Sequence, residues 1–164
     1  MISHGPGDHV ESTAGIRRLG RADGRTVAHF RDELSTWITD GFRLSDERRA
    51  DILLAVDEAL SNCADHAYEG RAESGPMRLT AEHDGGQDTL RFEVSDEGVW
   101  REPATTGVTA LRGRGLILMR SLADGVRIDR RADGTTVSIH FHDCPSDPRR
   151  GETRELALSG RGPA

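Results

Sequence analysis

The order of two hydrophobic periods along the chain constrains its fold more than any other feature. From Ser45 to Gly70 apolar residues recur at helical spacing, and Ser45 is the predicted N-cap of this long helix. The next two segments, "MRLTAEHD" and "TLRFEVSD", alternate apolar and polar residues and are joined by the turn "GGQD". A long helix with one apolar face, followed by a hairpin, predicts a helix layer on an antiparallel sheet.

The flanking segments extend this arrangement. "GIRRLGRA" is a predicted edge strand, and residues 24–39 have the spacing of a first helix. "GLILMRSLADG" is a short helix bounded by glycines, and "VRIDRRADGTTVSIHFH" is a second hairpin. The predicted fold class is therefore an α+β two-layer sandwich, with a mixed, mostly antiparallel sheet covered on one face by about three helices.

The two ends of the chain differ from its centre in composition. Residues 1–14 are polar and aperiodic and predict a flexible N-terminal arm. Residues 144–164 contain three prolines, four arginines and few apolar residues, so they predict a disordered C-terminal tail. We expect one folded domain over residues 15–143, which is long enough to enclose a core.

The charged residues exclude several kinds of chemistry. All 22 basic residues are arginine, so a lysine Schiff base and a P-loop lysine are both excluded. With 28 acidic residues the net charge is −6, which predicts no direct nucleic-acid binding and no anionic-membrane binding. No apolar run approaches roughly 18 residues, and we expect a soluble cytoplasmic protein with reduced cysteines.

A polar stripe on the long helix carries the first candidate site residues. At about 100° per residue, Glu58, Asn62, Asp65 and Glu69 fall opposite the apolar arc. The simplest interpretation is the solvated face of an amphipathic helix. A carboxylate and an amide one helical turn apart also suit a magnesium–phosphate site, in which the amide ligates Mg²⁺ and the carboxylate takes a proton.

Two further segments suit ligand binding. In "SDEGVW" the strand ends at Asp96 and Gly98, which form either a turn or a buried carboxylate beside an accessible backbone. In "LRGRGLILM" Gly113 and Gly115 open the predicted short helix. Free N–H groups at such a helix start favour an anion, and the interleaved arginines, Arg112 and Arg114, can bond to phosphate. A flexible turn is the alternative for this segment.

Taken in order, these segments resemble the GHKL ATPase superfamily, which has the Bergerat or histidine kinase-like ATPase fold. The resemblance is greatest to the small bacterial anti-sigma factor serine/threonine kinases, and it covers roughly residues 15–143. "LLAVDEALSNCADHAY" is similar to the N-box, "FEVSDEGVW" to the first glycine box, "RGRGLILMRSLADGV" to the second glycine box, and "GTTVSIHF" to the closing hairpin.

The resemblance implies a role for each candidate near the phosphates of ATP. Asn62 would ligate Mg²⁺, and Glu58 would be the general base that draws the proton from an attacking hydroxyl. Gly113 and Gly115 would close over the phosphates. Mg²⁺ and ATP are therefore the expected cofactors.

It also implies an adenine site at the strand end. Asp96 would accept a hydrogen bond from the adenine amino group, with Thr136 assisting, and Gly98 would let the base approach the backbone. Where many superfamily members have a second glycine in this box, this chain has Trp100. The ring can line the pocket, but it removes the backbone freedom of a glycine.

The function implied by the resemblance is regulatory. A member of this group would bind a sigma factor, phosphorylate a serine or threonine of an anti-anti-sigma factor, and work as a homodimer. The alternative is a nucleotide-dependent module that sequesters a partner without phosphorylating it. The catalytic half of a histidine kinase is disfavoured, because the first 50 residues hold no dimerisation helix with a phospho-accepting histidine.

Overall fold

The computed structural model describes residues 15–99 and 109–149, with side chains described from residue 114 onward in the last helix. Eight elements follow in the predicted order: β1 (Ile16–Arg21), α1 (Gly24–Gly41), α2 (Asp46–His66), β2 (Pro76–Asp84), β3 (Thr89–Asp96), α3 (Thr109–Leu122), β4 (Gly125–Arg131) and β5 (Gly134–Phe141). The predicted arm, most of the predicted tail and Trp100 lie outside the described residues.

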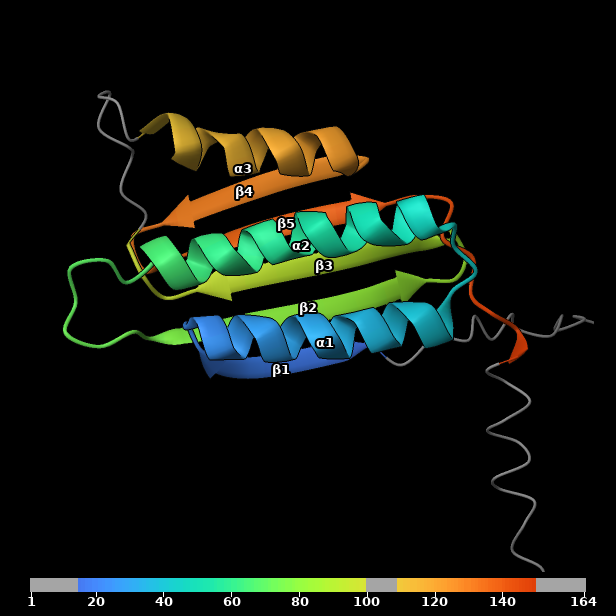
Figure 1. Cartoon of the computed structure of the whole chain (residues 1–164), viewed down its shortest axis with the longest axis horizontal. Coiled ribbons are helices and arrows are strands. Elements are labelled where there is room, and N and C mark those ends of the chain that lie inside the picture. The colour runs from blue at the N-terminus through green and yellow to red at the C-terminus, as the bar shows by residue number, and fades with distance from the viewer. Residues whose placement is uncertain (1–14, 100–108, 150–164) are drawn as a thin grey trace, which may run out of the picture.

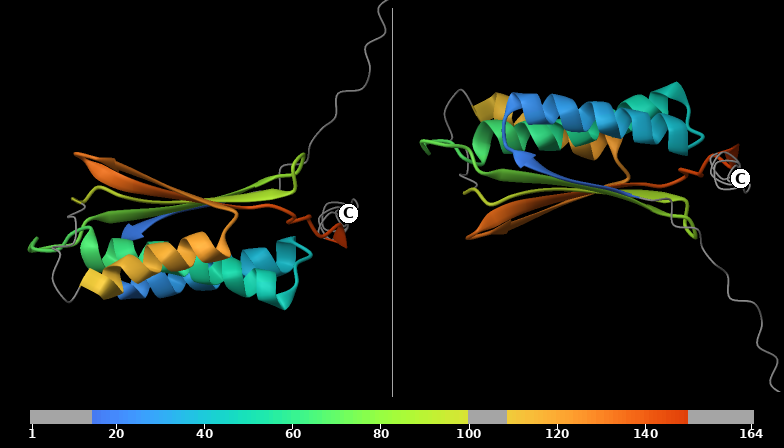
Figure 2. Two further views of the ribbon diagram at one scale, coloured as in Figure 1. Left: turned by 90° about the horizontal axis from the view of Figure 1, so that it is seen from above. Right: turned by 90° about the horizontal axis from the view of Figure 1, so that it is seen from below.

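The strands form one sheet in the order β1-β2-β3-β5-β4 (Figure 1). Each neighbouring pair in this sheet is antiparallel, so the sheet is antiparallel throughout rather than mixed. All three helices lie on the same face of the sheet, and no helix of the described chain covers the other face (Figure 2). The predicted α+β two-layer sandwich is confirmed.

The two long helices begin at side-chain caps. Asp23 accepts a hydrogen bond from the Thr26 N–H at 2.8 Å at the start of α1. Ser45, the predicted N-cap of α2, accepts one from the Arg48 N–H at 3.1 Å. Such bonds satisfy backbone donors that the first helical turn leaves free.

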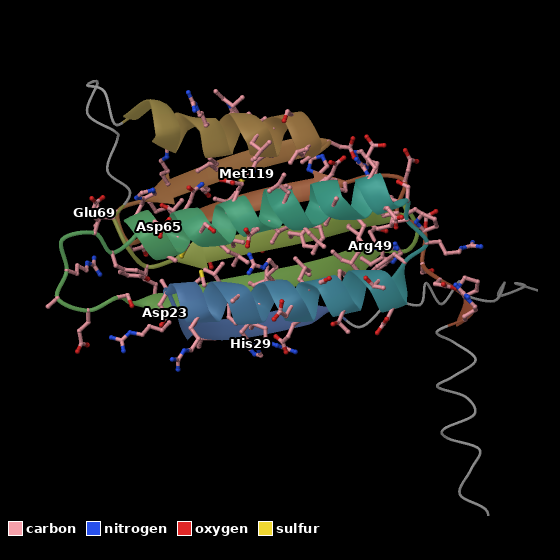
Figure 3. All side chains as sticks on the ribbon, viewed as in Figure 1. Asp23, His29, Arg49, Asp65, Glu69 and Met119 are labelled. Carbon is pink, nitrogen blue, oxygen red and sulfur yellow. The ribbon has the colours of Figure 1, made fainter. Side chains whose placement is uncertain are left out.

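The core fills the space between the helices and the covered face of the sheet. The predicted apolar arc of α2 is buried there, from Ile52 to Cys63, against strand residues such as Leu79 and Phe92. Among the side chains described in α3, from residue 114 onward, Met119 is buried, and Figure 3 labels it. Period-two burial along β2, β3 and β5 places the remaining polar residues on the uncovered face.

Ordered structure continues beyond the predicted domain end at residue 143. Cys144 is fully buried, and the Arg43 N–H donates to the Pro145 carbonyl at 3.0 Å. Ser146 forms an isolated antiparallel bridge with Phe42. We call residues 142–149 the C-terminal strap. A proline lacks only its own N–H, so the Pro145 carbonyl still accepts a hydrogen bond that attaches the strap to the domain.

An ion pair made by Arg48 connects the beginning of α2 to segments near the C-terminal end of the domain. The Arg48 guanidinium lies against the Asp124 carboxylate and donates to the His142 carbonyl at 2.9 Å. It also lies 4.9 Å from the centre of the Phe141 ring. Asp124 in turn accepts a hydrogen bond from the His142 N–H at 2.7 Å. Arg48 thereby joins α2, the α3–β4 corner and the end of β5.

Within the residues described, no helix has the length and apolar character needed to cross a membrane.

Candidate functional site

The structure brings Glu58 and Asn62 on α2 together with Gly115 on α3. Both polar side chains are partly buried. A Cβ atom placed on Gly115 would lie 2.7 Å from Glu58 Oε2 and 3.4 Å from Asn62 Nδ2. Asp65 is exposed in the last turn of α2, which ends at His66 and not at Gly70 as predicted, and Glu69 is exposed in the turns that follow the helix (Figure 3). The solvated-face interpretation therefore describes Asp65, whereas Glu58 and Asn62 are partly buried beside α3.

The glycine pair does not open α3 as predicted. The helix begins at Thr109, so Gly113 and Gly115 lie in its second turn. In an α-helix, N–H groups this far from the start bond to carbonyls four residues earlier, whereas the N–H groups of the first three residues, here 109–111, have no partner inside the helix. The positive helix end therefore lies about one turn earlier than the sequence suggested. In this conformation Gly115 lets α3 approach the two polar side chains of α2 closely.

The structure describes the side chain of only one of the two arginines beside these glycines. Arg114 is exposed on α3. For Arg112 and Gly113 the structure describes only the helical backbone, so the Arg112 side chain lies outside the described part of the chain. Their predicted contacts with phosphate remain predictions.

Asp96 ends β3 at a small cavity between α2 and the sheet. The cavity is lined by Ala59, Asn62, Cys63, Ala67, Val94, Asp96, Thr135 and Val137. Oδ1 of Asp96 accepts a hydrogen bond from the Gly98 N–H at 2.9 Å. Burial raises the pKa of Asp96, and hydrogen bonds from the N–H groups of Gly98 and Thr135 and from the Cys63 thiol oppose that rise. Asp96 is thus both a turn residue and a partly buried carboxylate that faces a cavity.

Gly98 packs against the C-terminal end of α2. A Cβ atom at this position would lie 1.9 Å from the Ala67 carbonyl oxygen, which already accepts a hydrogen bond from the Val99 N–H at 3.0 Å. Tyr68 holds the same turn, since its hydroxyl accepts from the Glu97 N–H at 2.8 Å and donates to the Pro76 carbonyl at 2.6 Å. The packing of the fold by itself therefore requires glycine at position 98.

The hairpin residue that faces Asp96 is Thr135, not Thr136. Thr135 is opposite Asp96 in the strand register, is 4% exposed and lines the cavity. Thr136 is opposite Ser95, and both line a groove on the uncovered face of the sheet. The alternation of strand side chains explains the correction, because Thr135 has the same parity as the buried Val137. The sequence alone contained this signal.

Cys63 also lines the cavity and had no predicted role in the site. It was placed on the apolar arc of α2, and it is buried as expected. The only hint that it would line the same cavity was its position directly after Asn62. That hint does not decide the matter, because helical neighbours differ by about 100° in direction.

The arrangement has the chemistry of a site for a ligand with one hydrogen-bonding end and one anionic, metal-bound end. Asp96 offers an acceptor inside the cavity, while Glu58 and Asn62 offer oxygen ligands or a base near α3. Among the described residues, no group of three or more His, Cys, Asp or Glu side chains could hold a metal ion. A Mg²⁺ ion beside Asn62 would therefore take most of its oxygen ligands from phosphates and water, which is its usual preference.

Comparisons with known proteins show the family of the domain and its fold. The family model for the histidine kinase-like ATPase domain matches residues 20–141, from the end of β1 to the end of β5. The chain therefore belongs to the histidine kinase-like ATPase domain family. No curated protein matches the sequence significantly.

Solved structures share the fold. The RsbU and RsbW domains of Rv1364c from Mycobacterium tuberculosis match with a TM-score of 0.63 and 24% identity, over 83% of this chain and 34% of that one. The histidine kinase domain of the blue-light activated histidine kinase EL346 from Erythrobacter litoralis matches with a TM-score of 0.51 and 21% identity, over 74% of this chain and 61% of that one. This chain thus spans about a third of the first structure.

Proposed function

We propose that this protein is an anti-sigma regulatory factor that binds Mg-ATP and phosphorylates a serine or threonine of an anti-anti-sigma factor. It would sequester a sigma factor in partner-switching control of transcription, as a cytoplasmic homodimer. The observation that carries the proposal is the convergence of Asp96 in its cavity with Glu58 and Asn62 beside Gly115. Family membership and the resemblance of four ordered motifs to the anti-sigma kinases support it.

The adenine end of the nucleotide would occupy the cavity at the end of β3. The Asp96 carboxylate would accept a hydrogen bond from the adenine amino group, and Thr135 would take the assisting role first expected of Thr136. Gly98 keeps the turn in place through its contact with α2. A base that offers a carbonyl instead of an amino group would face Asp96 acceptor to acceptor, so ATP would be preferred to GTP.

The phosphate end would lie between α2 and α3. Asn62 would hold Mg²⁺, which neutralises phosphate charge when bound. Glu58 would accept the proton of the attacking hydroxyl while the phosphoryl group transfers in line. The free N–H groups at the start of α3, with Arg112 and Arg114, would receive phosphate oxygens.

Substitution of Glu58 tests the catalytic part of the proposal. We expect Glu58→Gln to lower phosphotransfer from ATP to purified anti-anti-sigma factors of the source genome by about 10²–10⁴-fold, because it removes the base. Mg-ATP affinity, measured by calorimetry, should stay within about twofold, since a neutral amide preserves shape. Asp65→Asn, an exposed change on the same helix stripe, is the matched control and should alter neither quantity.

Two results would contradict the proposal at different levels. If the wild-type protein failed to bind Mg-ATP at millimolar concentration, the nucleotide site itself would be refuted. Binding of Mg-ATP without transfer to any anti-anti-sigma factor would instead support the alternative of a nucleotide-dependent module that sequesters its partner without kinase activity.

A further inference from the structure

The hydroxyl of Tyr68 lies between two strands at the point where their pairing stops. The β2–β3 ladder pairs Met77 with Asp96 and ends there. The next position of the same register belongs to Pro76 and Glu97, and the Tyr68 hydroxyl connects these two residues. It accepts a hydrogen bond from the Glu97 N–H at 2.8 Å and donates one to the Pro76 carbonyl at 2.6 Å. A side chain therefore replaces the backbone contact directly after Asp96.

This relay lets the end of β3 leave the sheet. In a regular antiparallel pair the two backbones bond directly, with about 2.9 Å between nitrogen and oxygen. Two hydrogen bonds in series reach further, so the chain can turn away from β2 without leaving its polar groups unpaired. The turn goes toward α2, where the Val99 N–H bonds to the Ala67 carbonyl at 3.0 Å.

The Tyr68 ring is itself held in place, so its hydroxyl is a fixed point for the turn. The residue is 6% exposed. A Cβ atom on Gly75 would lie 2.4 Å from the Tyr68 Cε1 atom, so the ring packs directly on this glycine. The Arg71 guanidinium lies 5.4 Å from the ring centre on the exposed side.

The direction of the Asp96 carboxylate depends on this turn. Its Oδ1 atom accepts a hydrogen bond from the Gly98 N–H at 2.9 Å, which closes a loop around Glu97. The Glu97 N–H is the group that Tyr68 binds. Any shift of Glu97 therefore moves both ends of the bond that orients the carboxylate.

We propose that Tyr68 is a positioning residue for nucleotide recognition, whose hydroxyl, acting through the Glu97 N–H, sets the direction in which the Asp96 carboxylate faces the purine. The inference rests on the proposed function, because it assumes that Asp96 receives the amino group of adenine. It gives Tyr68 a role in the selection of the base, in addition to its packing at the end of α2.

The test compares two nucleotides by calorimetry in the wild type and in Tyr68→Phe. Purine riboside triphosphate lacks only the amino group of ATP, so the wild type should bind Mg-ATP about 10–100-fold more tightly. Phenylalanine keeps the ring and removes the hydroxyl. Its affinity for Mg-ATP should fall by about 3–10-fold, while its affinity for purine riboside triphosphate stays within about twofold. A purely structural role would lower stability and leave the ratio of the two affinities unchanged.

A second measurement does not depend on the folding of a variant. Tyr68 is the only tyrosine in the sequence, so biosynthetic incorporation of meta-fluorotyrosine places one fluorine on this ring and keeps the hydroxyl. Its fluorine NMR resonance should shift on saturation with Mg-ATP, and by much less with purine riboside triphosphate.

The control is Asp124→Asn, which removes a carboxylate paired with Arg48 at the opposite end of the sandwich and should leave both affinities unchanged. Equal selectivity of Tyr68→Phe and the wild type would overturn the inference while the proposed function stands, as would an unshifted resonance with Mg-ATP bound. If the wild type failed to bind Mg-ATP, or bound both nucleotides equally, the assignment of Asp96 to adenine would be refuted and this inference with it.

Discussion

At the scale of single residues, the candidate site depends on the partly buried carboxylate of Asp96. Asp96 has lost enough water for its pKa to rise, yet it keeps hydrogen bonds that favour its charged form. Two residues later, Gly98 cannot carry a side chain, because the Ala67 carbonyl occupies that space. At the end of β3, packing therefore requires a residue without a side chain at Gly98, and the proposed ligand contact requires a carboxylate at Asp96.

Neutralising this carboxylate should abolish most nucleotide affinity. We expect Asp96→Asn to weaken Mg-ATP binding by about 10–100-fold, because a hydrogen bond to a charged group contributes about 1.5–3 kcal/mol. Calorimetry at pH 7 measures the change. Glu93→Gln alters an exposed carboxylate on the uncovered face of the same strand and should bind as the wild type does. Equal affinity of Asp96→Asn and the wild type would exclude Asp96 from the site.

At the scale of elements, the approach of α3 to α2 determines the geometry around Glu58. The two helices meet where Gly115 faces Glu58 and Asn62. A glycine inside a helix costs roughly 1 kcal/mol relative to alanine, so its presence at this position has a conformational cost without a local benefit to the helix. Space for the two polar side chains of α2 is what this glycine provides.

Replacing that glycine should separate stability from activity. Gly115→Ala gains helix propensity of up to about 1 kcal/mol, while its Cβ displaces the flexible Glu58 side chain from 2.7 Å. We expect the midpoint of thermal unfolding to stay equal or rise, and phosphotransfer to fall at least about tenfold, because misplacement of a base by an ångström is costly. Gly24→Ala, with open space around its Cβ, is the control and should leave phosphotransfer unchanged. Full activity of Gly115→Ala would show that Glu58 need not lie against α3.

At the scale of the whole molecule, the ends of the sandwich differ. The cavity lies where α2 and β3 end, whereas the strap and the Arg48 contact lie where these elements begin. Partial burial tends to raise the pKa of Asp124, but the hydrogen bonds from the His142 N–H and from Arg48 outweigh it and hold the pKa below its ordinary value. This end is therefore stabilised by an ionised carboxylate.

The sign of that shift gives a pH dependence. A depressed folded-state pKa means that Asp124 stabilises the fold above its unfolded pKa of about 3.9, and that the contribution disappears as pH falls through the lower folded value. We expect Asp124→Asn to unfold at lower urea concentration than the wild type at pH 7, and the difference to shrink at about pH 3. Asp32→Asn, at an exposed site on α1, should show neither effect. An unchanged difference at low pH would mean that packing, not charge, explains the loss.

Local patterns predicted most of the fold and part of the site. Ser45 is the N-cap of α2 because its hydroxyl and the acidic first turn are local signals. Strand parity could have selected Thr135 over Thr136. The start of α3 at Thr109 was missed because glycines are typical of a helix boundary. Here Gly115 lies inside the helix, where it allows close contact with α2. The burial of Cys144 likewise depends on partners distant in sequence, which composition cannot reveal.

The position of the strap has a practical consequence for anyone who handles this protein. Residues 142–149 leave the sandwich at the end opposite the cavity, beside the α1–α2 connection (Figure 1). A fluorescent label attached to Ser146 in the strap would therefore lie at the opposite end of the sandwich from Asp96. Immobilisation through the strap should leave the cavity end of the sandwich facing the solution, whereas a label introduced at Val99 would lie beside Ala67, which lines the cavity.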